Sequence, residues 1–136
     1  MNNYVAFDFE TAKGNYPCSI GIVEFLDGEV INEYYSLINP NIESFNPINI
    51  KIHGITKDDV VNEREFNEVW SDIKRFFEKK IIVAHNSSFD LSVLYNSLKR
   101  YDIPIPENIC FCTLRLSRDI LKLRNHKLNT LANHLR

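Results

Sequence analysis

The sequence has no long apolar run and no excess of basic residues, and each absence excludes a class of protein. No stretch approaches the roughly 20 apolar residues that a membrane-spanning helix requires, and the polar first residues do not resemble a secretory signal. We therefore expect a cytoplasmic protein that has no membrane partner. The formal net charge is −2 at pH 7, whereas domains that bind nucleic acid over a broad surface are usually basic. Any nucleic-acid binding must then be local.

Cysteine is also scarce, and the three cysteines present do not suggest disulfides. Cys18, Cys110 and Cys112 are odd in number and lack C-x-x-C spacing, which favours free thiols in a chain with no export signal. Cys110 and Cys112 would supply zinc ligands together with His85 and His126, but the paired spacing of such sites is missing. The 136 residues contain no repeat or linker and predict a single domain.

The first strongly patterned segment is YVAFDFE, residues 4–10. Apolar side chains alternate with other residues along it, which predicts a strand. The period of two in a strand places Asp8 and Glu10 on the same face. Because an unpaired carboxylate is costly to bury, these acids either end a half-exposed strand or have a chemical purpose.

The remaining patterns predict further strands and helices. Asp27-Gly28 between two strand-like stretches is typical of a two-residue hairpin, so the first three strands are expected to be antiparallel. A Pro- and Asn-rich loop is expected over 39–60, ending in a short helix capped at Thr56. It is followed by a helix over 65–80, a strand over 81–84 and a helix capped by Ser87 or Ser88. The last expected elements are a strand over 108–111 and helices within 113–123 and 126–136. This order predicts a mixed α/β sheet.

A third acid, Asp90, falls in the first turn of the helix that follows strand 81–84. In α/β sheets, ligands bind where strand ends and the starts of the following helices converge, so Asp8, Glu10 and Asp90 are expected to meet. Three carboxylates repel one another unless cations neutralise them, and all-oxygen ligation favours Mg²⁺ or Mn²⁺. Two such ions can activate a water molecule and stabilise the leaving oxygen in phosphoryl transfer.

Four short motifs occur in order along the chain: FDFETA at 7–12, IHGIT at 52–56, AHNSSFD at 84–90 and HKLNTLANHL at 126–135. Together they resemble the DnaQ-like DEDD exonucleases, a family that includes the proofreading subunit of bacterial DNA polymerase III. The resemblance implies an RNase H-like fold and removal of nucleotides from single-stranded 3′ ends by two-metal-ion hydrolysis. It also implies a polymerase or another replication or repair protein as a partner, and it leaves the choice between DNA and RNA open.

The resemblance also implies roles for individual residues. The family's metal-binding and catalytic acids are matched by Asp8, Glu10 and Asp90. The positions that line the pocket for the terminal nucleotide are matched by Thr11, His53, Asn86 and Phe89. Among these, the aromatic ring of Phe89 is expected to pack against a sugar or a base.

The chain departs from the family near its C-terminus, because no third motif of the form H-x-x-x-x-D or Y-x-x-x-D follows HKLNTLANHL. In the family this motif supplies a general base and a fourth carboxylate. We therefore expect residues 1–136 to be one exonuclease-like domain that is incomplete at its C-terminus and lacks its last helix. Such a domain would be inactive or weakly active, and the apolar face left exposed would favour self-association.

Two other functions stay open. A noncatalytic module of the same fold would bind nucleic acid or a protein partner without turnover. A haloacid-dehalogenase-like phosphatase would use Asp8 as a nucleophile, because VAFDFET loosely resembles the strand and D-x-D-x-T motif of that class, although Glu10 fits it poorly. Hydrolysis from 3′ ends, release of phosphate from a monoester, and binding without turnover distinguish the three functions in an assay.

Overall fold

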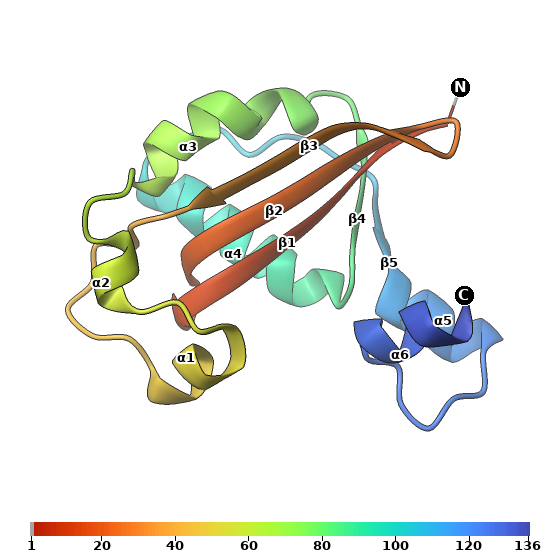
Figure 1. Ribbon diagram of the computed structural model, residues 1–136. Helices are drawn as coiled ribbons and strands as arrows, with labels where there is room; N and C mark the ends of the chain where they lie inside the picture. Colours follow the sequence, from red (N-terminus) through yellow and green to blue (C-terminus); the bar gives the residue numbers. More distant parts are fainter. Residues whose placement is uncertain (1) are drawn as a thin grey trace.

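The computed structural model describes residues 2–136 and shows a mixed five-stranded sheet with helices packed against one face and around its ends (Figure 1). The strands are β1 (Asn3–Lys13), β2 (Tyr16–Leu26), β3 (Glu29–Leu37), β4 (Ile81–Ala84) and β5 (Cys110–Cys112). The first three are antiparallel, β4 runs parallel to β1 and β5 runs parallel to β4, in the order β3-β2-β1-β4-β5. The predicted α/β class, with antiparallel strands first, is confirmed.

The predicted hairpin at Asp27-Gly28 joins β2 to β3. Both residues have positive φ, 50° at Asp27 and 85° at Gly28, which is the conformation that a type I′ turn requires at its two central positions. The carboxylate of Asp27 also accepts a hydrogen bond from the backbone N–H of Asn2 at 3.0 Å. The turn therefore fixes both the pairing of β2 with β3 and the start of β1.

The segment 39–60 is not the long loop that its composition predicted, because it contains the helix α1 (Pro47–His53). The Asn46 side chain caps this helix by accepting the Ile48 N–H, Pro47 occupies the first turn, and Gly54 ends the helix with a φ of 78°. An N-cap, an N-terminal proline and a C-terminal glycine are standard helix boundaries. They outweigh the polar, proline-containing composition of the segment.

The second part of the same segment agrees with expectation. Thr56 and Asp59 form a reciprocal capping box at the start of α2 (Lys57–Val60). The Asp59 carboxylate accepts from the Thr56 N–H at 2.8 Å. The capping box fixes the start of α2 at the last residue of the IHGIT motif.

The helix predicted over 65–80 is shorter than expected. Helix α3 (Phe66–Ile73) is followed at once by the 3₁₀ turn η1 (Lys74–Phe76). This tighter turn accompanies the burial of two adjacent side chains, Phe76 and Phe77, which a straight α-helix would place about 100° apart. The expected apolar face is nonetheless buried.

The remaining helices are α4 (Ser87–Arg100), α5 (Thr113–Ile120) and α6 (Leu128–His134). Asn86, rather than Ser87 or Ser88, occupies the N-cap position of α4. Figure 1 shows α3 and α4 lying along one side of the sheet, α1 and α2 at the end of β1, and α5 and α6 beyond β5. No helix within residues 2–136 is long and apolar enough to cross a membrane.

One face of the sheet carries the main core. Val5, Phe7 and Phe9 of β1 pack there with Ile22 of β2 and Ile82 of β4. The helices that cover this face contribute buried side chains from α3 and α4, namely Phe66, Val69, Trp70, Ile73, Val93, Leu94 and Leu98. Since odd-numbered positions of β1 face this core, its even-numbered positions point to the opposite face.

Candidate active site

The strand β1 brings two acids to the sheet face that lies opposite the core. Asp8 is exposed and Glu10 is half-buried, while Phe9 between them is buried. The pairing of β1 with β2 shifts register immediately after Glu10, and such irregularities bend a strand and redirect its side chains. The sequence prediction that both acids share a face follows directly from the alternation along β1.

Asp90 approaches these acids from α4. Strand β4 pairs with β1 only as far as Ala6, and beyond that point the Phe9 N–H donates to the Asp90 carboxylate at 2.9 Å. Asp90 is only 1% exposed. The third acid is therefore held at a fixed place against the backbone that joins Asp8 to Glu10.

The pKa of each of the three carboxylates is raised, and burial is the main cause. Burial raises the pKa of Asp90 to about 7; the Phe9 N–H opposes this shift, while the negative charges of Asp8 and Glu10 add to it. Burial also raises the pKa of Glu10, with a further contribution from Asp8. Removal from water raises the pKa of Asp8, and the nearby His85 partly offsets this effect. Negative charge therefore gathers at this site, and His85 beside Asp8 and His53 beside Glu10 compensate it only in part.

The donor set fits a hard divalent cation, which prefers carboxylate oxygens. The Phe9 N–H fixes Asp90, whereas Asp8 is exposed and Glu10 is half-buried. Within residues 2–136, no three His, Cys, Asp or Glu side chains are already grouped so that they could hold a metal ion. The carboxylates therefore share an electrostatic environment but are not a preassembled ligand cage.

A pocket of about 410 Å³ lies beside the acids, between the end of β1, helix α1 and the start of α4. Three of the four predicted nucleotide-pocket residues line it, together with Glu10, and these are Thr11, His53 and Phe89. Two lining residues that the sequence interpretation missed are Asn49 and Ile52. Both lie on α1, so the error of treating this segment as a loop concealed them. Asn49 lies three residues before Ile52 and four before His53, and a helix assignment would have shown that these spacings bring the side chains together.

Asn86 is the predicted pocket residue that does not line this cavity. It is exposed, has a φ of 65°, and accepts a hydrogen bond from the Ser88 hydroxyl at 3.3 Å. Asparagine tolerates this left-handed conformation better than most residues. In this structure Asn86 forms the turn between β4 and α4, the helix that carries Asp90.

The histidines near the acids already have hydrogen-bond partners. His85 uses Nε2 to reach the His126 carbonyl at 2.7 Å and Nδ1 to reach the Thr113 hydroxyl at 3.0 Å. His53 likewise uses Nε2 toward the Thr11 carbonyl at 2.8 Å and Nδ1 toward the Ile55 N–H at 3.0 Å. Neither ring has a nitrogen left to accept a proton from an attacking water molecule.

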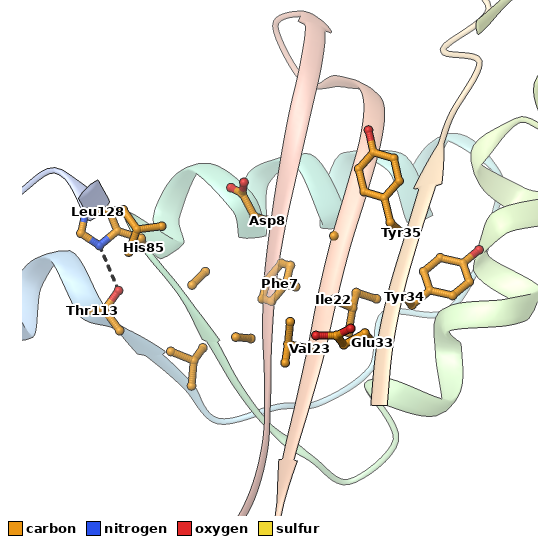
Figure 2. Close-up of a pocket in the computed structure, with 14 residues that line it drawn as sticks. Phe7, Asp8, Ile22, Val23, Glu33, Tyr34, Tyr35, His85, Thr113 and Leu128 are labelled. Atoms are coloured by element: carbon orange, nitrogen blue, oxygen red, sulfur yellow. Dashed lines mark hydrogen bonds between the residues drawn. The ribbon is translucent and has the colours of Figure 1, made fainter. Parts of the chain in front are cut away.

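The face of the sheet that carries Asp8 is open and largely apolar. A groove of about 600 Å³ lies there. Figure 2 shows Asp8 between His85 on one side and Tyr35 on the other. The lining of the groove also includes Val23 and Val83 from the neighbouring strands. Parallel strands usually have both faces covered, whereas antiparallel strands such as β1, β2 and β3 often leave one face open to water. The self-association expected from an exposed apolar face stays a prediction.

Cys112 of β5 differs in character from Cys18 of β2. Burial opposes ionisation of Cys112, but the N–H groups of Arg115 and Ser87 outweigh it and lower the pKa to about 7. Burial, with help from Glu10, raises the pKa of Cys18 to about 12. Cys18 belongs to a small apolar cluster with Ala12 and Val60 that packs near α1 and α2.

Comparison with known proteins identifies relatives along nearly the whole chain. The exonuclease family model RNase_T matches residues 5–136. A PolC-type DNA polymerase III from Oceanobacillus iheyensis is 34% identical over 139 residues, a match that covers 98% of this chain and 10% of that protein. The chain thus spans about a tenth of the length of this relative.

Solved structures of nucleases share the fold. Exonuclease X in complex with 5′ overhanging duplex DNA superposes with a TM-score of 0.78 at 24% identity, covering 97% of this chain and 72% of that one. The nuclease domain of 3′hExo, a DEDDh family member bound to rAMP, gives a TM-score of 0.78 at 15% identity, covering 98% and 78%. At these identities the likeness establishes the RNase H-like architecture alone.

Proposed function

The chain belongs to the RNase_T exonuclease family, and we propose that it is a metal-dependent domain that removes nucleotides from single-stranded 3′ ends of nucleic acid. The observation that carries this proposal is the placement of Asp90, buried and bonded to the Phe9 N–H between Asp8 and Glu10. A nucleic-acid-processing role also agrees with the cytoplasmic location expected from the sequence. The family match excludes the phosphatase alternative.

Asp8, Glu10 and Asp90 would hold Mg²⁺ or Mn²⁺ ions. When bound, two such ions supply an activated water molecule and stabilise the leaving oxygen. The chain itself supplies the fixed position of Asp90 and the pocket beside Glu10, where Thr11 and Phe89 would bind the terminal nucleotide. The PolC-type relative supports a polymerase as the partner in the cell.

We also propose that residues 1–136 alone hydrolyse 3′ ends only slowly. A general base contributes typically about 10²- to 10⁴-fold in rate. His53 and His85 are the histidines near the acids, and both ring nitrogens of each are already engaged. Asp119, the last acid in the sequence, is exposed on α5. Neither histidine is thus free to act as that base.

The proposal is tested with protein in excess over a 5′-labelled single-stranded oligonucleotide and Mn²⁺. We expect slow shortening from the 3′ end that is lost in Asp8→Asn and retained in Asp58→Asn, a control at an exposed acid of α2. Shortening without added metal would contradict the proposal. Binding of the oligonucleotide without any shortening would instead support the noncatalytic alternative.

A further inference from the structure

Helix α1 is attached to the end of β1 through one of its faces. The Asn46 N–H donates to the Ala12 carbonyl at 2.9 Å. The Asn49 amide donates to the Thr11 carbonyl at 3.1 Å and to the Thr11 hydroxyl at 3.2 Å. His53 reaches the same carbonyl at 2.8 Å. These positions are spaced three and four residues apart, so they share one side of the helix.

The Thr11 carbonyl is available for these contacts because the sheet is irregular there. Register shifts flank Thr11 on both sides, and the residue opposite it on β2 is Pro17. Proline has no N–H to donate to a neighbouring strand. Helix α1 therefore supplies the donors for a carbonyl that this β2 residue cannot satisfy.

Both ring nitrogens of His53 take part in hydrogen bonds around this attachment. Its Nδ1 atom accepts the Ile55 N–H, so the ring proton lies on Nε2 and is donated to the Thr11 carbonyl. The ring thus holds the backbone at Thr11. The hydroxyl of Thr11 is held by a different residue, Asn49.

We propose that Asn49 is a positioning residue that aims the Thr11 hydroxyl at the terminal nucleotide; this inference rests on the proposed function. A hydroxyl has one proton and two lone pairs. The Asn49 amide nitrogen only donates, so it occupies a lone pair of the hydroxyl and leaves the proton free. Within residues 2–136 that proton has no other hydrogen-bond acceptor, and Thr11 lines the pocket beside Glu10. The proton is available to an oxygen atom of the nucleotide.

The test measures binding of thymidine 5′-monophosphate at saturating Mn²⁺ by calorimetry. The variants are Asn49→Ala, Thr11→Val and the double variant, with Asn67→Ala on the exposed side of α3 as the control. Loss of one hydrogen bond to a ligand corresponds to about a tenfold rise in Kd. We expect that rise in each single variant. The double variant should bind no more weakly than Thr11→Val alone, and Mn²⁺ affinity should stay unchanged in all.

A double-mutant cycle separates positioning from a general structural role. If Asn49→Ala costs as much in the Thr11→Val background as in the wild type, Asn49 does not act through the hydroxyl and the inference is wrong. An unchanged Kd in Asn49→Ala also overturns it and leaves the proposed function intact. Absence of both nucleotide and Mn²⁺ binding in the wild-type protein would overturn the proposed function as well.

Discussion

Replacing Asp90 by asparagine changes the charge of the buried acid while preserving its shape. In Asp90→Asn the side-chain carbonyl would still accept the Phe9 N–H, which the carboxylate accepts at 2.9 Å in the wild type. The difference between the two proteins is therefore the cost of ionising a carboxyl group that is 1% exposed and faces two other acids. That cost depends on pH.

The sign follows from proton linkage. The pKa of Asp90 is raised from 3.8 to about 7 in the folded chain, so the folded state holds the proton more tightly than the unfolded state. Its contribution to stability is complete below pH about 4 and is lost as pH rises through about 7. A shift of about three pKa units corresponds to about 4 kcal/mol at most. The Asp90→Asn variant has no carboxyl group to ionise at this position, so it does not lose this stability as pH rises.

We expect Asp90→Asn and the wild type to be about equally stable near pH 4 and the variant to be more stable by up to about 4 kcal/mol at pH 8. Urea unfolding in the presence of a chelator, followed by the fluorescence of the buried and only tryptophan, Trp70, measures this difference. Asp58→Asn serves as the matched control at an exposed acid and should follow the wild type at both pH values. If Asp90→Asn were less stable than the wild type at pH 8, ionisation of Asp90 would not be what destabilises the folded chain at that pH.

Three further predictions concern reactivity, turnover and association. At pH 7.5 iodoacetamide should modify Cys112, with its pKa of about 7, well before Cys18, with its pKa of about 12; peptide mass mapping that finds equal rates would contradict this. Single-turnover 3′ hydrolysis by residues 1–136 should be roughly 10²- to 10⁴-fold slower than in a family member that carries the third motif, and equal rates would show that the chain has its own base. Sedimentation should show association that grows with concentration and weakens in Val23→Lys, a change in the apolar groove; a wild-type protein that is monomeric throughout would count against it.

Local sequence patterns predicted the sheet because each signal acts over a few residues. The alternation around Asp8 and the Asp27-Gly28 turn depend only on neighbouring side chains, and both features are present in the structure. The contact of Asp90 with the Phe9 N–H joins residues 81 positions apart. No periodicity reports such a contact. The expectation that these segments meet came instead from the convergence of strand ends and helix starts in α/β sheets and from the family motifs.

The composition of its segment did not predict helix α1. Composition marked its segment as a loop, whereas Asn46, Pro47 and Gly54 act as helix boundaries at particular positions. Because the helix was not predicted, the pocket residues Asn49 and Ile52 on α1 were not predicted either. Asn49 becomes recognisable only when the helix places it against Thr11, whose carbonyl receives no hydrogen bond from Pro17 opposite it on β2.

The most direct test of the metal site is a titration of the wild-type chain with Mn²⁺ at pH 8, followed by the loss of the electron paramagnetic resonance signal of free Mn²⁺. We predict weak binding, roughly in the millimolar range, because only three carboxylates contribute. Binding should be abolished in Asp8→Asn and in Asp90→Asn, and unchanged in Asp58→Asn. Undiminished Mn²⁺ binding in Asp8→Asn or Asp90→Asn would contradict the claim that these carboxylates form the metal site.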